Sequence, residues 1–331
     1  MKSKVKYMLL IFLFLFLAIF AYFFIGGTKP APEMNWGVNF SLKQTDFLGL
    51  DDRETYLALL DELKIKRIKI SVHWDLLEKE RNEFDFSELD WQMREAEKRN
   101  VDVVLAIGMR TPRWPECHMP TWVRNLDKID QQQNILKMMA RIVSRYKDSP
   151  SLIGWQVENE AFLDFGACPW SDSGFLKQEV GFIKKIDSQH PIILTESGEL
   201  SLWMRSAAIG DVVGVTTYRK VWQDQLDFYF SYRLPAVFYY RRAEIVRHVF
   251  KKEVVGVELQ AEPWCKQSII NASLEEQMIT FDLGQFYQNV DFAKKTGIDT
   301  FYFWGAEWWY WMKIKQSHPE FWEVAKIFMS Q

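Results

Sequence analysis

The chain has 331 residues, of which 48% are hydrophobic, so it can bury one large core or two modest ones. Its 41 basic and 44 acidic residues give a formal net charge of -3. No global positive field attracts nucleic acid, and we do not expect nucleic acid as a partner. Aromatic residues make up 16% of the chain, with 15 tryptophans. This composition suits a protein that stacks flat, weakly charged ligands such as sugars.

The N-terminus carries lysines at positions 2, 4 and 6 and then an uncharged apolar run over residues 7–25. The run is long enough, as a helix, to cross the hydrocarbon core of a bilayer. It ends in aromatic residues before Gly26 and lacks the small-residue site of a cleavable signal peptide, so residues 1–27 are predicted to be a signal anchor, with cleavage as the alternative. The positive-inside rule then predicts a single-pass protein of the cell membrane with its catalytic domain outside the cytoplasm.

Residues 28–33 form a short proline-rich linker, and no second linker divides residues 34–331. In this region short β-prone runs alternate with longer helical patterns, which is typical of βα units around a parallel sheet. The eight predicted strands are 36–40, 67–72, 101–107, 151–157, 191–195, 211–216, 254–259 and 300–304. The helical patterns with apolar residues at helical spacing include 53–63, 86–99, 131–146, 173–186 and 274–295. Eight strands in one undivided domain favour an α/β fold of the (β/α)8 TIM barrel type, and an open doubly wound sheet is the alternative.

Carboxylates follow two of the predicted strands at the end where a barrel of this type has its active site. Asn159 and Glu160 come at the end of the fourth strand, and Glu258 comes at the end of the seventh. A retaining glycosidase needs two carboxyl groups about 5–5.5 Å apart, one as nucleophile and one as acid/base. Strands four and seven lie across the barrel mouth from each other, so these two glutamates can flank one glycosidic bond.

These residues resemble the motifs of the clan A glycoside hydrolases, the superfamily that includes cellulases, mannanases and β-galactosidases. The resemblance extends over nearly the whole chain after the N-terminal helix. It implies that Glu160 is the acid/base, that Asn159 hydrogen-bonds the 2-hydroxyl of the sugar, and that Glu258 is the nucleophile. It also implies that Tyr218 hydrogen-bonds the nucleophile and that Trp304 forms the floor of the sugar-binding site.

One position departs from the family pattern. Members usually carry arginine where this chain has Lys69. Lysine keeps the positive charge near the nucleophile but lacks the planar fork that can hold a carboxylate through two bonds. Arg67 has the same side-chain parity along the strand and partly compensates, deeper in the barrel.

Further residues near the strand ends are candidate substrate contacts. They are His73, Trp74, Glu262 and Trp264, together with Lys69. Glu262 competes with Glu258 for the nucleophile position, and we favour Glu258 because it lies closer to the strand and is better held by sheet hydrogen bonds. Glu196 and Glu307 are expected to bind hydroxyls or buttress loops. Glu158 is expected to be a structural carboxylate or to support the residues of the site. The loops offer no His-Glu spacing typical of zinc, so neither a metal nor another cofactor is expected.

The three cysteines, Cys117, Cys168 and Cys265, all fall in loops on the mouth side of the predicted barrel. In an oxidising compartment we expect a disulfide between Cys117 and Cys168 that joins the third and fourth loops. The insertion at 222–241 is rich in aromatic residues. It is compatible with a cap over the cleft, a contact with the membrane surface or a contact with another subunit.

The resulting hypothesis is a membrane-anchored retaining β-glycoside hydrolase that acts on a poly- or oligosaccharide by double displacement. The alternative is a catalytically inactive barrel that binds carbohydrate, which Lys69 favours. A metal-dependent hydrolase on the same fold ranks last, because among strand-end residues only His73 fits a metal ligand. The sugar, the linkage and the oligomeric state are left open by the sequence.

Overall fold

The computed structural model describes residues 2–330, with side chains from Lys4 onward, so the predicted cytoplasmic lysine at position 2 has its side chain outside the described part. Helix α1 (Lys2–Phe24) is followed by an extended connection to the first strand. Its segment Lys4–Phe24 has a mean hydropathy of 2.6 and is not buried against the rest of the protein. This confirms an N-terminal helix that is long and apolar enough to span a membrane. The same features fit a signal sequence.

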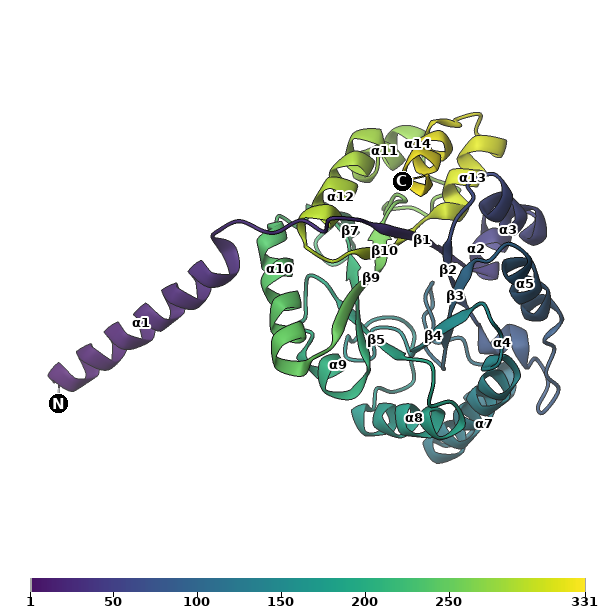
Figure 1. Cartoon of the computed structure of the whole chain (residues 1–331), viewed down its shortest axis with the longest axis horizontal. Coiled ribbons are helices and arrows are strands. Elements are labelled where there is room, and N and C mark those ends of the chain that lie inside the picture. Colours follow the sequence, from purple (N-terminus) through teal and green to yellow (C-terminus); the bar gives the residue numbers. More distant parts are fainter. Residues whose placement is uncertain (1, 331) are drawn as a thin grey trace.

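Eight parallel strands close into a barrel, which confirms the predicted fold class (Figure 1). The strands are β1 (Asn35–Phe40), β2 (Arg67–Ser71), β3 (Asp102–Ile107), β4 (Leu152–Val157), β5 (Ile192–Ser197), β6 (Val212–Thr217), β9 (Glu253–Gln260) and β10 (Thr300–Trp304). Val38 of β1 is in register with Ile68 on one side and with Phe303 on the other, so the first strand joins the last and closes the barrel. The open doubly wound sheet is thereby excluded.

Helices surround this barrel (Figure 1). The long ones are α3 (Asp52–Asp61), α5 (Ser87–Lys98), α7 (Lys128–Tyr146), α8 (Ser173–Ile186), α10 (Ala236–Ile245), α12 (Leu283–Lys295), α13 (Ala306–Lys315) and α14 (Glu320–Met329). The short ones are α2 (Leu42–Phe47), α4 (Trp74–Leu77), α6 (Thr121–Arg124), α9 (Met204–Ile209), α11 (Leu274–Thr280) and the π-helical turn η1 (Val246–Phe250). Aspartates cap the backbone N–H groups that begin several of them, as Asp51 does for α3 and Asp127 for α7.

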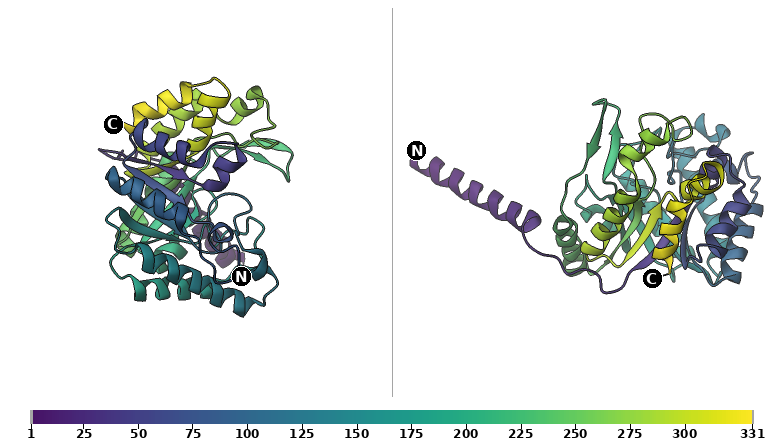
Figure 2. Two further views of the ribbon diagram at one scale, coloured as in Figure 1. Left: turned by 90° about the vertical axis from the view of Figure 1, so that its right-hand side faces the viewer. Right: turned by 90° about the horizontal axis from the view of Figure 1, so that it is seen from above.

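Two predicted segments differ in the structure. The helical pattern over 274–295 is two helices, α11 and α12, because the chain turns at Phe281 and Asp282, and the Asp282 side chain accepts from Gln285 N to start α12. The insertion at 222–241 contains most of an antiparallel hairpin, β7 (Lys220–Gln223) with β8 (Phe228–Ser231), and the first part of α10. The hairpin projects beyond the barrel in both views of Figure 2.

The core lies between the barrel and its helices and is strongly aromatic. The fully buried tryptophans include Trp74, Trp155, Trp203, Trp308 and Trp309. Such packing fixes the strands and therefore the positions of the side chains at their carboxyl ends. The site described next is built on that edge.

Candidate active site

The end of β4 presents Glu160 to the barrel mouth through a sharp local turn. Glu158 and Glu160 both have left-handed backbone conformations, with φ of 55° and 42°. The Glu160 amide nitrogen donates to the Thr195 hydroxyl at 2.7 Å, and the Thr216 hydroxyl donates to Glu160 Oε1 at 2.9 Å. Strands β5 and β6 therefore hold both the backbone and the carboxyl of Glu160.

Glu258 lies near the end of β9 and is almost fully buried. The Tyr218 hydroxyl donates to its Oε2 at 2.7 Å. Its Oε1 lies 3.6 Å from Lys69 Nζ and has no hydrogen-bond partner among the described residues. A buried carboxylate oxygen without a donor is available to react, while the other oxygen is held in place by Tyr218.

Lys69 lies on the barrel interior with no exposed surface. Its Nζ donates to Gln156 Oε1 at 2.9 Å and so lies between the amide of Gln156 and the carboxylate of Glu258. Burial lowers the pKa of Lys69, and the nearby charge of Glu258 opposes that shift. The lysine thus supplies one positive charge beside Glu258 without reaching hydrogen-bonding distance.

Glu160 and Glu258 are electrostatically coupled. Burial raises the pKa of Glu160 to about 8, and the charges of Glu258 and Glu116 add to the increase. At neutral pH Glu160 is therefore mainly protonated. A carboxyl group that is protonated at neutral pH can act as a general acid.

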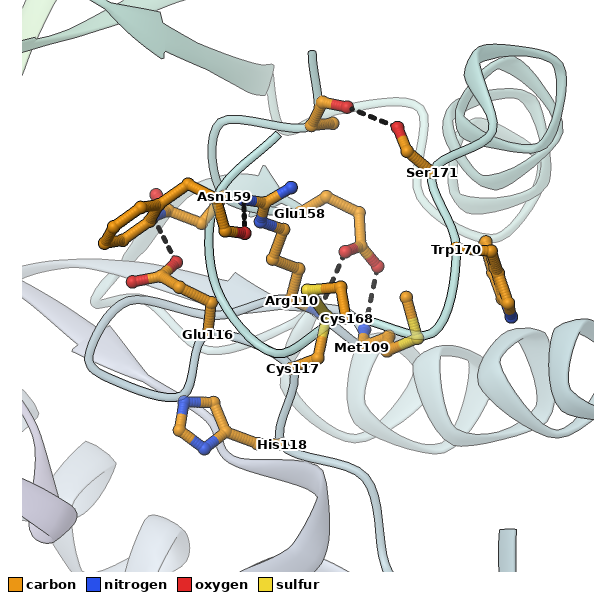
Figure 3. The surroundings of a disulfide bond; sticks show 12 residues. Met109, Arg110, Glu116, Cys117, His118, Glu158, Asn159, Cys168, Trp170 and Ser171 are labelled. Carbon is orange, nitrogen blue, oxygen red and sulfur yellow. Dashed lines mark hydrogen bonds between the residues drawn. A yellow bond between two sulfur atoms is a disulfide. The ribbon is translucent and has the colours of Figure 1, made fainter. Parts of the chain in front are cut away.

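A third carboxyl group, Glu116, also lies in the site, and sequence reasoning missed it. It follows β3 by nine residues in a loop, where its backbone has a φ of 70°. Asn159 Nδ2 donates to Glu116 Oε2 at 3.0 Å, a contact visible in Figure 3. Burial raises the pKa of Glu116 to about 8. Its neighbour Cys117 was the one available sequence signal, because the predicted disulfide joins this loop to the one that begins at Glu160.

That disulfide is confirmed. Cys117 and Cys168 are bonded, with their Cα atoms 5.2 Å apart, and Cys265 is free (Figure 3). The bond fastens the loop after β3 to the loop after β4. Glu116 and Glu160 are therefore carried by two loops that are covalently joined.

Glu158 turns away from the mouth and supports the loop after β3, which agrees with the structural role expected for it. Its carboxylate accepts from the backbone nitrogens of Met109 and Arg110 at 2.7 and 2.8 Å (Figure 3). Burial raises the pKa of Glu158 to about 7. Glu196 is also structural, because it accepts from Ser206 N at 2.8 Å at the start of α9.

A buried arginine, Arg113, crosses the mouth from the β3 loop and was not predicted. It is paired with Glu262, and its Nη2 donates to Glu307 Oε2 at 3.2 Å. Its guanidinium lies 3.9 Å from the ring centroid of Trp304. Glu262 is thus engaged in an ion pair, and one face of Trp304 is covered. Glu307 also accepts from Ser41 N at 2.8 Å, so it buttresses the loop after β1.

The remaining predicted contacts separate into two groups. Trp264 stands at the rim, 37% exposed, with its ring edge-on to Tyr218 at 5.2 Å between centroids. Trp74 lies in the core with no exposed surface, and its indole nitrogen donates to Glu78 Oε2. The structure therefore differs from the predicted role of Trp74 in substrate binding. The reason is that the chain enters α4 directly after β2 and turns this residue inward.

His73 also differs from its predicted role as a substrate contact. Its Nε2 is hydrogen-bonded to the Ser41 hydroxyl at 2.9 Å and its Nδ1 to the Thr111 hydroxyl at 3.0 Å. Both ring nitrogens are used, and the side chain is buried. Among the described residues no group of three or more His, Cys, Asp or Glu is arranged to hold a metal ion.

Glu199, in the loop after β5, supports Tyr218 and was also missed. Its Oε1 accepts from Tyr218 N at 3.0 Å and from the Tyr239 hydroxyl at 2.6 Å. It therefore positions the backbone of the residue that hydrogen-bonds Glu258. Nothing in its local sequence distinguishes it from other loop glutamates.

The comparisons with known proteins agree with the barrel fold. A family model described as beta-galactosidase matches residues 51–175, a segment that contains Asn159 and Glu160 but not Glu258. A beta-galactosidase from the haloarchaeon Halorubrum lacusprofundi has a TM-score of 0.55 at 15% identity, over 82% of this chain and 52% of that one. The resemblance to the clan A glycoside hydrolases is confirmed.

Other clan A barrels match as well. GH5_18 of Streptomyces cattleya, in complex with GlcNAc, has a TM-score of 0.57 at 14% identity, over 83% of this chain and 71% of that one. Xylanase 10B of Thermotoga petrophila, in complex with xylobiose, has a TM-score of 0.54 at 14% identity and covers 82% of each chain. No curated protein sequence matches significantly. At these identities the structures share the fold alone, and this chain spans about half the length of the Halorubrum beta-galactosidase.

Proposed function

We propose that the chain is a retaining β-glycosidase in which Glu258 is the nucleophile and Glu160 the acid/base. The observation that carries this proposal is the different environment of the two carboxyls. Glu258 is held by the Tyr218 hydroxyl and faces Lys69, whereas burial and the charge of Glu258 raise the pKa of Glu160 to about 8. Two carboxyl groups in such different environments are suited to different roles, one as the acid and the other as the nucleophile.

In the proposed first step, Glu258 attacks the anomeric carbon while Glu160 donates its proton to the leaving oxygen. In the second step, Glu160, now ionised, accepts a proton from water, which displaces Glu258 from the sugar. Asn159 remains able to contact the sugar, because Nδ2 carries two protons and Glu116 accepts one of them. Trp264, exposed beside Tyr218, is the candidate platform for a pyranose ring.

We also propose that α1 remains attached as a membrane anchor, with the barrel outside the cytoplasm of the cell. The end of α1 packs on the folded domain: Phe24 stacks on Phe238 of α10 with centroids 5.0 Å apart. A cleaved signal sequence would leave this contact unmade. The Cys117–Cys168 disulfide supports an oxidising compartment for the barrel.

The test is turnover of a panel of aryl β-glycosides and β-linked oligosaccharides by the full chain in detergent. Glu160→Ala and Glu258→Ala are compared with the surface control Glu323→Ala on α14. We expect retention of anomeric configuration in the wild type and the control, and loss of turnover with Glu258→Ala. Glu160→Ala should lower turnover by roughly 10²–10⁴-fold. Azide should restore turnover to both variants. The product should be a glycosyl azide in each case, and the two products should have opposite anomeric configurations. An inverted product from the wild type would contradict the proposal.

A second candidate, an inactive carbohydrate-binding barrel, is favoured by one observation. The Arg113 guanidinium covers one face of Trp304, the residue expected to floor the sugar site. If the wild type turns over none of these substrates but binds sugars in calorimetry, this second candidate replaces the first. Recovery of turnover in Lys69→Arg would then assign the loss of activity to the missing arginine fork.

A further inference from the structure

Helix α10 lies at the junction of the barrel and the N-terminal helix. Phe238 stacks on Phe24, and the Arg241 guanidinium lies 5.0 Å from the ring centroid of Tyr22. Figure 1 shows α1 leaving the molecule at α10. Because these contacts involve the last turn of α1, the start of α10 lies at the level where α1 would leave a bilayer.

Two other segments are fastened to α10. The β7–β8 hairpin ends at Ser231 and α10 begins at Ala236, so residues 232–235 are the whole connection. A connection this short spans at most about 16 Å. On the other side, Arg242 of α10 donates to the backbone oxygens of Gly198 and Ser201, both at 2.5 Å, and so ties down the loop after β5.

Both segments carry large apolar side chains that are exposed to solvent. We call this set the apolar rim; it consists of Leu200, Leu202, Met204, Leu226, Phe228 and Phe230. Leu200, Leu202 and Leu226 are each more than 60% exposed. Strands β5 and β6 are paired, so the segments that follow their carboxyl ends lie in neighbouring sectors of the barrel mouth. Exposed apolar side chains in two neighbouring sectors are typical of a surface that contacts a partner.

A bilayer is the partner that fits. The rim and the last turn of α1 are attached to the same helix, and the hairpin projects beyond the barrel (Figure 2). Asp224 and Asp227 lie at the turn of the hairpin. Asp227 is paired with Lys266 Nζ at 2.6 Å, so these charges give the turn little attraction for anionic lipids, and the apolar side chains hold the contact.

We propose that the apolar rim rests in the interfacial layer of the bilayer that α1 spans. The barrel is then docked on the membrane by two attachments, α1 and the rim, and the sector of its mouth formed by β5 and β6 lies beside the lipid surface. This inference rests on the proposed retention of α1 as an anchor. It does not depend on whether the barrel is catalytically active.

The experiment uses the full chain with Cys265→Ser, so that the Cys117–Cys168 disulfide leaves no other free thiol. Single cysteines Leu226→Cys and Leu200→Cys are labelled with an environment-sensitive fluorophore. The protein is placed in phosphatidylcholine nanodiscs with and without nitroxide-bearing lipid. Ile129→Cys is the matched control, because Ile129 is 67% exposed at the start of α7 on the far side of the barrel. Leu15→Cys, inside α1, reports insertion of the anchor.

We expect blue-shifted emission and nitroxide quenching at positions 15, 200 and 226, and neither at position 129. The signal at 226 should persist at high salt, because apolar contacts are not screened, and should be reduced by Phe228→Ser with Phe230→Ser. If position 15 is quenched while 200 and 226 behave like 129, the rim proposal is overturned and the anchor stands. If position 15 is also unquenched, the anchor proposal fails first, and the rim proposal fails with it.

Discussion

The side-chain amide of Asn159 donates to the carboxylate of Glu116 at 3.0 Å, so a third glutamate is attached to the residue that precedes the proposed acid/base. Its charge is one of the causes that raise the pKa of Glu160. The site therefore holds three carboxyls, Glu116, Glu160 and Glu258, near the single ammonium of Lys69. The protonation of one carboxyl depends on the charge of the others.

This relationship predicts a shift in the pH profile of Glu116→Gln. Glu160 acts as an acid only when protonated, so kcat/KM of the wild type should fall as the pH rises through about 8. Glu116 ionises over the same pH range, because its pKa is also about 8. Glu116→Gln removes the negative charge that forms there, which lowers the pKa of Glu160, so the fall should occur at a lower pH in the variant. The measurement is kcat/KM against pH for an aryl β-glycoside. If the alkaline limb of the pH profile lies at the same pH in the variant and the wild type, Glu116 does not influence the protonation of Glu160.

Tyr218→Phe should lower kcat without unfolding the protein. The lost hydrogen bond joins the Tyr218 hydroxyl to a carboxylate oxygen, Glu258 Oε2, at 2.7 Å. Such bonds contribute about 1.5–3 kcal/mol, which corresponds to a fall of roughly 10- to 150-fold. Tyr229→Phe, on the projecting hairpin, is the control. Equal kcat values for Tyr218→Phe and the control would argue against Glu258 as the group that reacts.

Lys69→Met should destabilise the fold. The substitution removes the cation 3.6 Å from the buried Glu258. Leaving one partner of a buried pair uncompensated costs about 3–5 kcal/mol in the free energy of unfolding, measurable by denaturant titration. A variant as stable as the wild type would show that Lys69 is not the counter-charge.

Removing the disulfide with Cys117→Ser and Cys168→Ser should affect both stability and activity. The bond closes a loop with a sequence separation of 51, and its loss should lower the free energy of unfolding by about 2–4 kcal/mol. Because Glu116 adjoins Cys117, kcat/KM should fall even at temperatures where the variant is folded. Cys265→Ser controls for loss of a cysteine alone. If the double variant is less stable but its kcat/KM is unchanged, the disulfide stabilises the fold without positioning the residues of the site.

Much of the fold and part of the site could be predicted from local patterns. Eight β-prone runs each became a barrel strand, because the interior of a parallel sheet demands such runs. Asn159, Glu160 and Glu258 were predicted as site residues because the carboxyl ends of barrel strands lie at the mouth. The disulfide was predicted because both cysteines fell in loops on that side.

Only the tertiary structure decided the rest. Glu116 and Arg113 lie well past the end of β3, and the path of their loop, which no short pattern encodes, brings one to Asn159 and the other across the mouth to Glu262. His73 and Trp74 follow a strand as closely as Glu160 does, yet they turn inward because the chain enters α4 at once. The position of a strand is indicated by residues close together in the sequence. The direction of a side chain in a loop depends on packing and ion pairs between residues far apart in it.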